Sequence, residues 1–416
     1  MKLKTFLIVG CLGGLFTLSS CTAPTNVKDY SAYVNPFIGT GGHGHTFPGA
    51  VVPHGMIQPS PDTRIDGWDA CSGYYYADST INGFSHTHVS GTGCCDYGDV
   101  LLMPTVGKQQ YRTTDPQSQR LAYASSFSHK NEIAEPGYYS VFLDTYQVKA
   151  EISSTKRGAI HRYTFPENTE SGFIIDLDYS LQRQTNSEME IEVISDTEIC
   201  GHKKTTYWAF DQYINFYAKF SKPFSYTLVT DSITMDNGKR LPVCKALLHF
   251  NTSKDEQVLV KVGVSAVDIA GARKNVESEI PGWDFEKVRK DARTAWNEYL
   301  SKIDITTSDK EDKAIFYTAL YHTGISPNLF TDADGRYLGM DLEVHQGDTL
   351  NPIYTVFSLW DTFRALHPLM TIIDPDLNNH FINSLIKKHQ EGGIYYDWLS
   401  CCSGHRGCLD ERVSQF

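Results

Sequence analysis

The chain has 416 residues, with 37 Lys and Arg against 49 Asp and Glu, a formal net charge of −12 and a sequence pI of about 5.7. At roughly 150 residues per domain, this length predicts two or three domains. The acidic balance and the lack of any Lys- or Arg-rich run argue against nucleic acid or an anionic membrane surface as the partner. The composition does not argue against neutral polyhydroxyl ligands.

The N-terminus carries the pattern of an export signal. Two lysines precede an apolar run over residues 6–18, which is shorter than the ~20 residues that span a bilayer. The run leads into LSSC, which resembles a bacterial lipoprotein cleavage site and ends at Cys21. We therefore predict a lipoprotein signal peptide over 1–21, lipidation at Cys21 and a tether over 22–29. The protein would be an exported bacterial lipoprotein that faces the periplasm or the cell surface and meets the membrane through its lipid anchor.

Residues 35–104 are rich in histidine, aromatic residues and glycine. Glycine weakens strands and helices by roughly 0.5–1 kcal/mol relative to alanine, so the glycines within residues 39–44 favour loops of special backbone geometry. Binding residues collect on loops that a rigid scaffold holds. Histidines such as His86 and His88 beside the flat face of Trp68 suit a sugar site, where rings stack on C–H faces and polar tips bind hydroxyls. The alternative is that these are ordinary core histidines and turn glycines.

Residues 138–267 show mostly a period of two. Alternate residues from Ile214 to Phe220 are apolar, and similar short runs recur on both sides of this segment. Such alternation between Gly, Asn, Asp and Ser turns is typical of antiparallel sheets that pack face to face. We predict an antiparallel β-sandwich over 30–278.

The period then changes to that of helices. Residues 279–304 place apolar residues such as Trp296 at spacings of three and four, which predicts an amphipathic helix that connects two domains. A capping box from Ser308 to Glu311 opens the next helix, which runs to about Thr323.

Two further helices are expected in the last hundred residues. One begins near Trp360, and another begins at Asp374 and Pro375, because aspartate caps free N–H groups and proline suits the first helical position. The second helix stops at Gly392. Three successive helices without intervening strands predict an all-α domain over 305–393 that is not complete.

The cysteines give no support to a metal site. The ten cysteines form no CxxC pair, so neither zinc nor thioredoxin-like chemistry is indicated. A site built from Cys401, Cys402 and His405 is a weak rival, because two adjacent cysteines lack the usual ligand spacing. We predict no metal ligand set within this chain. One disulfide is compatible with an exported protein, but the sequence does not indicate which cysteines would pair.

Several ordered motifs resemble glycoside hydrolase family 92. The resemblance covers roughly residues 33–393, and its motifs include Trp68, His86, His88 and Trp360. In chain order they are VNPFIGT (34–40), PGA (48–50), PHGM (53–56), GW (67–68), CSGY (71–74), GFSHTHVSG (83–91), YGD (97–99) and SLWDTFR (358–364).

Members of that family are exported bacterial exo-α-mannosidases that depend on calcium and invert the anomeric carbon. The resemblance implies a mixed, multidomain fold, with an N-terminal antiparallel β-sandwich, a helical connector and the first helices of an incomplete (α/α)6 barrel that forms a partial catalytic domain. It implies that Trp68 and Trp360 lie at the sugar subsites and that Asp361 and Arg364 bind hydroxyls of a terminal mannose. His86 and His88 match a family motif without an assigned contact. The expected substrates are α-mannosides of N-glycans or mannan.

The family's acid and base have no counterpart in the sequence. Inversion needs two carboxyl groups about 6.5–9.5 Å apart. In the family, these groups and most calcium ligands come from later barrel segments, so we expect most of the calcium ligands beyond residue 416. Thr169-Glu170 and Asp332-x-Asp334 do not match those segments. We predict no catalytic acid or base within this chain, and no turnover by it.

The tail over 394–416 departs from the family pattern. Residues 408–416 can be encoded by a nucleotide string that, read one base later, gives Ala-Leu-Met-Asn-Gly-Tyr-His-Ser, which contains the family's Met-Asn-Gly-Tyr-His-like segment. We therefore hypothesise a frameshift near residue 394 that truncates a longer α-mannosidase, which sequencing of the gene would test. The alternatives are a non-catalytic, surface-tethered mannan-binding lipoprotein and an unstable remnant with exposed helix faces.

Overall fold

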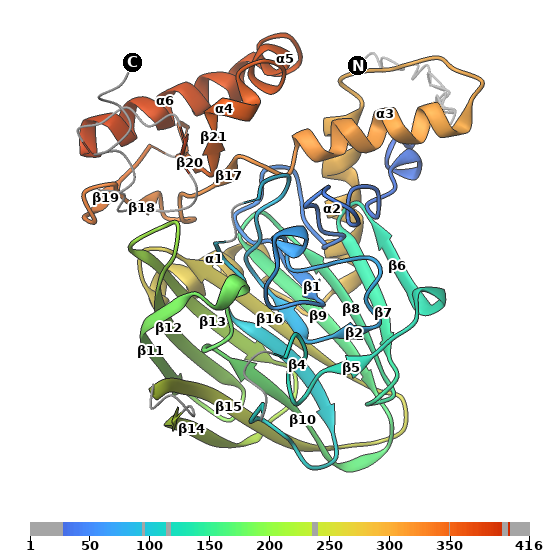
Figure 1. Cartoon of the computed structure of the whole chain (residues 1–416), viewed down its shortest axis with the longest axis vertical. Coiled ribbons are helices and arrows are strands. Elements are labelled where there is room, and N and C mark those ends of the chain that lie inside the picture. The colour runs from blue at the N-terminus through green and yellow to red at the C-terminus, as the bar shows by residue number, and fades with distance from the viewer. Residues whose placement is uncertain are drawn as a thin grey trace, which may run out of the picture.

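The computed structural model describes residues 28–93, 96–113, 118–234, 240–348, 350–392 and 398–399. A large antiparallel β domain forms one end of the molecule, and the helices that follow it in the chain gather mainly at the other end (Figure 1). The predicted mixed, multidomain organisation, with β-sheets first and helices after them, is confirmed. The predicted signal peptide, Cys21 and most of the 394–416 tail lie outside the described residues.

Two large sheets make up the β domain, and all their neighbouring strands are antiparallel. The first sheet has the strand order β1 (Ser60–Asp62), β3 (Gly83–Ser85), β4 (Leu101–Val106), β10 (Asn168–Asp176), β15 (Arg240–Thr252) and β14 (Ser225–Thr234). The second has the order β11 (Thr185–Val193), β12 (Glu198–Thr206), β13 (Gln212–Phe220), β16 (Glu256–Ser265), β9 (Gly158–Phe165), β8 (Val148–Ser154), β7 (Tyr138–Leu143) and β6 (Glu132–Glu135). A small ladder pairs β2 (Thr80–Ile81) with β5 (Ser125–Ser126).

The two sheets enclose one hydrophobic core. Phe173 on β10 of the first sheet meets Tyr163 on β9 and Phe220 on β13 of the second, with ring centroids 5.0 and 5.4 Å apart. Phe165 and Phe250 make a further contact of this kind at 5.5 Å. Aromatic pairs at these distances stabilise a core beyond the area that they bury. The sheets therefore pack face to face, as the alternating pattern predicts.

The alternation on β13 is confirmed on one face only. Ile214, Phe216, Ala218 and Phe220 point into the shared core, but Tyr217 on the opposite face is also fully buried. A helix that the sequence pattern does not predict covers that face.

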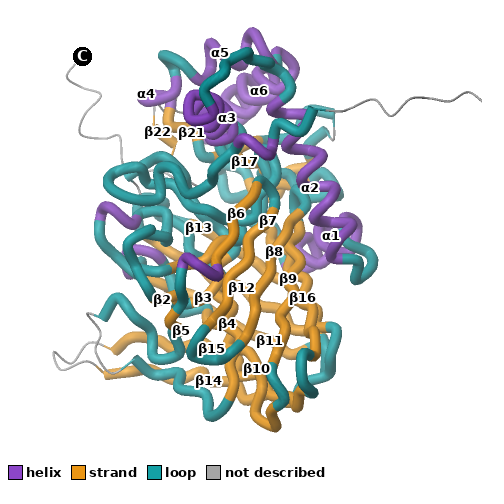
Figure 2. The backbone as a smooth tube through the Cα atoms, turned by 90° about the vertical axis from the view of Figure 1, so that its right-hand side faces the viewer, coloured by secondary structure: helices purple, strands orange, loops and turns teal. Residues whose placement is uncertain are grey.

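That helix, α1 (Ile269–Glu279), packs along the outer face of the second sheet (Figure 2). It approaches β16 so closely that a Cβ on Gly263 would lie 2.1 Å from the Ala272 carbonyl oxygen, and Asp268 caps its N-terminus. The segment escaped detection because Ala272 and Val276 supply only a short apolar stripe. The predicted sandwich boundary at 278 consequently falls inside this helix.

The amphipathic helix predicted within 279–304 is confirmed as α2 (Phe285–Leu300), with Trp296 fully buried. The next helix, α3 (Lys310–Thr323), ends where predicted, but the predicted capping box is wrong. Asp309, and not Ser308, is the N-cap, because its carboxylate accepts hydrogen bonds from the backbone N–H groups of Glu311 and Asp312.

The expectation of three helices without intervening strands is also wrong. Short ladders follow α3, because the segment is broken by Asn, Asp and Gly residues that allow pairing over only two or three residues. The ladders pair β17 (Asn328–Leu329) with β20 (Tyr354–Thr355), β18 (Arg336–Leu338) with β19 (Val344–Gln346), and β21 (Phe357–Ser358) with β22 (Trp398–Leu399). The helices α4 (Leu359–Thr362), α5 (Leu366–Ile373) and α6 (Pro375–Gly392) follow β21, and α6 begins and ends where predicted.

The N-terminal loops join the two ends of the molecule. Phe47, Val51 and Tyr74 belong to the same buried cluster as Trp296 of α2 and Phe381 of α6. Trp296 also donates a hydrogen bond from its indole N–H to the Val51 carbonyl at 2.6 Å. Residues 30–59, which contain no strand, therefore bind the helices to the β domain. None of the helices in the described part of the chain has the length and apolar character needed to cross a membrane.

Candidate functional site

Trp68 begins the short 3₁₀ helix η2 (Trp68–Ala70), and 58% of its surface is exposed. Gly67 precedes it with φ +107°, a backbone conformation that glycine tolerates best. Gly93 lies against the indole edge, since a Cβ on that glycine would come within 2.4 Å of the indole nitrogen. The loops therefore hold the indole in place while leaving much of the side chain open.

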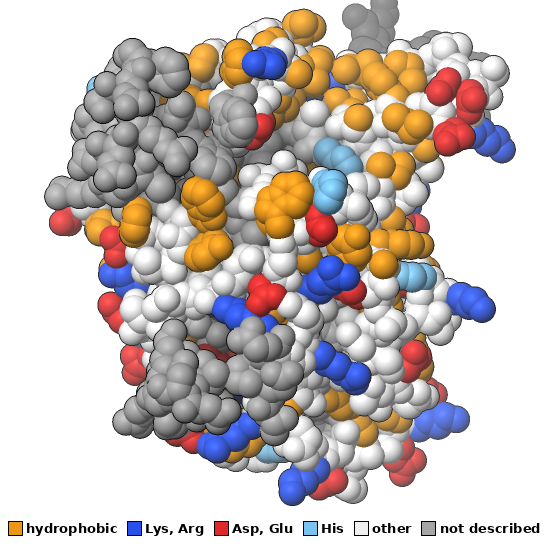
Figure 3. Space-filling model, in the orientation of Figure 1, with side chains coloured by type: hydrophobic (Ala, Val, Ile, Leu, Met, Phe, Trp, Pro, Cys, Tyr) orange, Lys and Arg blue, Asp and Glu red, His pale blue; other side chains and the backbone are white. Residues whose placement is uncertain are grey.

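Two histidines support the tryptophan. The His45 ring meets Trp68 edge to face with centroids 4.3 Å apart, and the His43 ring lies 5.1 Å from it. His43 Nδ1 also lies 2.5 Å from Asp69 Oδ1, and both of these side chains are well exposed. An exposed aromatic face beside histidines is the combination that the sequence predicts for sugar binding, although His43 and His45, and not His86 and His88, supply the rings here. Figure 3 shows histidine side chains beside hydrophobic and acidic ones between the helical end and the β domain.

His86 and His88 lie elsewhere, in the interior. Both are fully buried. His86 Nδ1–H donates to the Val100 carbonyl at 2.7 Å, and its Nε2 lies 3.1 Å from Nε2 of His161. Burial lowers the pKa of His86 to about 4, so the ring is neutral.

His88 is enclosed in the same way. Its Nδ1 lies 2.7 Å from the Gln58 carbonyl oxygen and its Nε2 lies 2.9 Å from Asp62 Oδ1. Neither His86 nor His88 has a ring face or nitrogen that a sugar could reach, so their place is beneath the loops. This outcome matches the alternative that they are core histidines.

Asp361 and Arg364 are exposed at the start of the helical segment that follows β21. Ser358 Oγ–H donates to Asp361 Oδ2 at 2.7 Å, which orients the carboxylate. The Arg364 guanidinium lies 5.2 Å from the ring centroid of Phe363. The side chain of Trp360 lies outside the described ones. The roles of Trp360, Asp361 and Arg364 in sugar contact stay predictions.

Packing links this segment to the loops around Trp68. Val356, two residues before Ser358, lies in one buried cluster with Val89 and Tyr97. The loop after Val89 returns to the surroundings of Trp68, where the Gly91 N–H donates to the His45 carbonyl at 2.7 Å. The structure therefore brings the SLWDTFR motif and the tryptophan loop to a common side of the molecule.

The glycines that hold the indole, Gly67 and Gly93, were not singled out as site residues from the sequence. The glycine density of residues 35–104 was the signal for them. Density alone does not say which glycine lies against a ring, because that depends on how the loops meet in the fold.

Among the described residues, no three His, Cys, Asp or Glu side chains gather in a way that could hold a metal ion. The carboxylates beside Trp68 and in the SLWDTFR motif, Asp69 and Asp361, are each engaged by one neighbouring side chain. Calcium binding stays an expectation from the family resemblance.

Comparisons with known proteins agree with the motifs. A model described as the glycosyl hydrolase family 92 N-terminal domain matches residues 33–265, and one described as the family 92 catalytic domain matches residues 271–407. The second match includes part of 394–416, the segment predicted to be aberrant. An uncharacterized secreted glycosidase of Arthroderma benhamiae is 30% identical over 362 residues, which cover 77% of this chain and 46% of that protein.

Solved structures give the same result. The GH92 α-mannosidase BT3965 from Bacteroides thetaiotaomicron is 35% identical, with a TM-score of 0.83 over 89% of this chain and 51% of that one. The inverting mannosidase BT2199 from the same species is 28% identical, with a TM-score of 0.78 over 92% of this chain and 51% of that one. The chain thus spans about half the length of these relatives. With family models that together match residues 33–265 and 271–407, the chain belongs to glycoside hydrolase family 92.

Proposed function

We propose that this chain carries the sugar-binding portion of an exo-α-mannosidase and contacts a terminal α-mannoside through Trp68, Asp361 and Arg364. The single observation that carries the proposal is the family match over both parts of the chain. It is supported by the 35% identity to an α-mannosidase, which has also been solved in complex with mannoimidazole. The expected substrates are terminal α-mannosides of N-glycans or mannan.

Each proposed contact has a physical basis. The exposed face of Trp68 offers an apolar surface on which the C–H groups of a sugar ring stack. Asp361 accepts hydrogen bonds from sugar hydroxyls, and Arg364 donates them. Hydrogen bonds to charged groups contribute roughly 1.5–3 kcal/mol each, which is enough to fix the orientation of the terminal sugar.

We expect binding without hydrolysis from the 416 residues. Inversion requires a protonated carboxyl to release the leaving group and a second carboxylate to activate water on the opposite side, about 6.5–9.5 Å away. The family segments that carry this pair have no counterpart in the sequence. No step of this proposal is routed through calcium.

The test is mannose release together with binding. The purified chain is incubated with α-linked mannobiose, with and without added calcium, and free mannose is measured. The expected result is no release and weak binding, in the millimolar range by calorimetry. Calcium-stimulated release of mannose would contradict the prediction of inactivity, while micromolar binding without release would favour a non-catalytic glycan-binding protein.

Export through a lipid anchor at Cys21 is part of the same proposal. The relative from Arthroderma benhamiae is named a secreted glycosidase, which supports export. We expect Cys21→Ala to move the protein from the membrane fraction to the soluble fraction and to abolish labelling by radioactive palmitate. Labelling of the variant equal to the wild type would contradict the anchor.

A further inference from the structure

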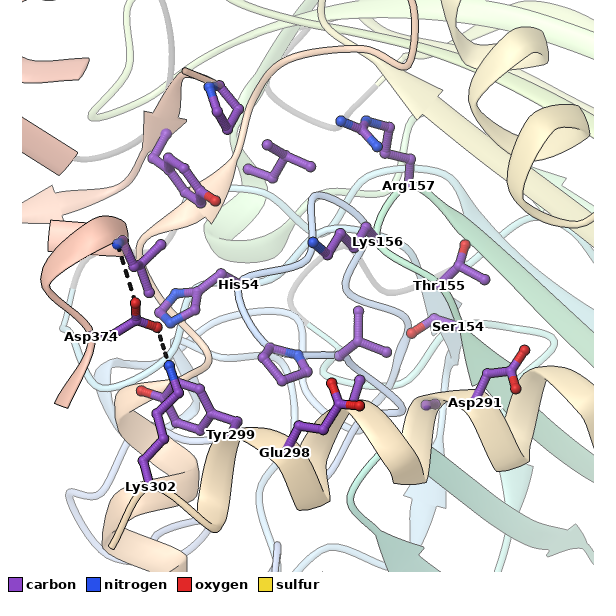
Figure 4. Close-up of a pocket in the computed structure, with 18 residues that line it drawn as sticks. His54, Ser154, Thr155, Lys156, Arg157, Asp291, Glu298, Tyr299, Lys302 and Asp374 are labelled. Carbon is purple, nitrogen blue, oxygen red and sulfur yellow. Dashed lines mark hydrogen bonds and ion pairs between the residues drawn. The ribbon is translucent and has the colours of Figure 1, made fainter. Parts of the chain in front are cut away.

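A cavity of about 520 Å³ lies where three parts of the chain meet. Its walls are the turn after β8, one side of α2 and the start of α6, and Figure 4 shows their side chains around it. None of Trp68, Asp361 and Arg364 lines it. Its size lies within the ~300–1,000 Å³ of small-molecule sites, and such sites are common between domains.

The floor of the cavity is apolar and fixed. Val52, Leu329, Tyr299 and Tyr354 line it and are each less than a tenth exposed. His54 stands beside them, with its Nδ1–H donating to the Pro327 carbonyl at 2.8 Å and its ring centroid 5.6 Å from that of Tyr299.

The His54 backbone adds to this rigidity. Its N–H donates to the Gly324 carbonyl at 2.6 Å, and its carbonyl accepts from the Leu329 N–H at 2.9 Å. The floor is therefore preformed, and a ligand would not have to order it on binding.

The rim is polar and has unused charges. Lys156 is exposed on a tight turn in which the Thr155 N–H donates to the Gly158 carbonyl at 2.7 Å. Glu298 is exposed on α2. Within the described residues, neither the Lys156 ammonium nor the Glu298 carboxylate has a hydrogen-bond or ion-pair partner.

The charges of two other rim residues are already paired. Lys302 pairs with Asp374, as the dashed line in Figure 4 shows. Arg157 pairs with Glu279 at 2.7 Å. The described part of the rim therefore keeps a free cation and a free anion, so it favours neither a polyanion nor a polycation.

The geometry of α2 explains why the space exists. Asp291, Ala295, Glu298 and Lys302 follow one another at intervals of four, three and four residues, so they lie along one side of the helix and of the turn that ends it. The small Ala295 leaves room between the charged side chains. Glu298 can therefore reach over the cavity from one wall while Lys156 faces it from the other (Figure 4).

We propose that this cavity is a second carbohydrate site, which takes a short neutral oligosaccharide. A free donor and a free acceptor on the rim suit hydroxyl groups, and the apolar floor with two tyrosines suits the C–H faces of sugar rings. The choice of α-mannosides as the ligand rests on the function proposed above, whereas the preference for a neutral polyhydroxyl ligand rests on the cavity itself.

The test is binding of a linear α-linked mannotetraose to the whole chain, followed by calorimetry and by hydrogen exchange of the backbone. Two variants remove the site in different ways: Lys156→Met with Glu298→Gln removes both free charges at exposed positions, and Ala295→Phe fills the space. We expect each to weaken binding about tenfold or more, because a hydrogen bond to a charged group is lost or the ligand is excluded. Bound ligand should protect the Thr155–Gly158 turn from exchange.

Trp68→Ala separates this site from the function proposed above. The inference is supported if the tetrasaccharide still protects the Thr155–Gly158 turn in Trp68→Ala and no longer does so in the cavity variants. It is overturned if binding depends on Trp68 alone, which would leave the proposed function standing. It is also overturned if inorganic phosphate occupies the cavity and the tetrasaccharide does not, or if the tetrasaccharide gives no protection of the turn in the folded wild type.

Discussion

Replacement of His161 by glutamine is expected to reduce the acid sensitivity of the β domain. Tyr163 O–H donates to His161 Nδ1 at 2.9 Å, the Nε2 atoms of His161 and His86 share a hydrogen bond at 3.1 Å, and His86 Nδ1–H donates to Val100. Because His86 uses its only proton on Val100, its Nε2 accepts and His161 Nε2–H donates. When both rings are neutral, each donor in this chain of hydrogen bonds has an acceptor. A second proton on His86 would place its Nε2–H directly opposite the Nε2–H of His161.

The magnitude follows from the pKa of His86, which burial lowers from 6.5 to about 4. Burial also lowers the pKa of His161. Because these folded-state values lie below those of the unfolded chain, unfolding takes up protons once the pH falls below about 6.5. Neutral His86 contributes its full stabilisation above pH 6.5. As the pH falls towards 4, about 3 kcal/mol of this stabilisation is lost. A histidine that is neutral in the folded protein and protonated in the unfolded chain adds at most about 1.4 kcal/mol per pH unit to the slope.

The assay is urea denaturation between pH 7.5 and 4.5. His161→Gln should lower the slope of unfolding free energy against pH between pH 6 and 5, whatever its effect at pH 7.5, because it removes a buried histidine whose pKa lies well below its ordinary value. One such group changes the slope by at most about 1.4 kcal/mol per pH unit. His43→Gln is the matched control, because the His43 side chain is 74% exposed and takes no part in the buried hydrogen-bond chain. Equal slopes for wild type and His161→Gln would refute the assignment of two neutral buried rings.

Three further outcomes are expected. Trp68→Ala should weaken binding of mannobiose about tenfold in calorimetry while leaving the melting temperature nearly unchanged, because most of the indole surface is exposed. Asp309→Ala should lower the unfolding free energy in urea by about 1 kcal/mol, because two N–H groups at the start of α3 lose their acceptor. Gly73→Ala should destabilise the protein by more than about 2 kcal/mol in the same assay, because φ is +84° and the new Cβ would lie 1.9 Å from Asp62 Oδ1.

Each of these changes has a control in the chain. Tyr226→Ala removes another half-exposed aromatic side chain, on β14, and should leave binding intact. Ser308→Ala should leave stability within about 0.5 kcal/mol, and a larger loss would restore Ser308 as the cap. Gly91→Ala, where φ is +77° and nothing lies within 4 Å of the new Cβ, should cost only the left-handed backbone strain of about 1–2 kcal/mol.

Some of this architecture could be predicted because its signal is local. The alternation from Ile214 to Phe220 predicts a strand with one face in a core, and Asp374 with Pro375 predicts where α6 begins. Such patterns arise from the side-chain period of a strand and from the free N–H groups of a helix start, so a few neighbouring residues are enough to specify them. The ordered family motifs are likewise short local sequences, so they indicate the family without a structure.

Other features depend on residues far apart in the chain. The residues around Gly263 give no signal that α1 packs against it. Ser308 and Asp309 are both favourable N-cap residues, and only the backbone conformation decides which of them caps α3. The short ladders after α3 pair segments as distant as Phe357–Ser358 and Trp398–Leu399. Propensity cannot rank such contacts, because their free energy comes from what each residue meets after the chain folds.

The amino-acid sequence by itself determined the acidic charge balance of this protein, the order of β domain and helices, and its membership of the family. Tertiary structure decided where each histidine lies. His43 and His45 stand beside an exposed tryptophan, whereas His86 and His88 lie in the interior with protein acceptors around them. The physical reason is that burial and hydrogen-bond partners are set by contacts between distant segments, and these contacts decide whether an imidazole can meet a ligand or must stay neutral in the core.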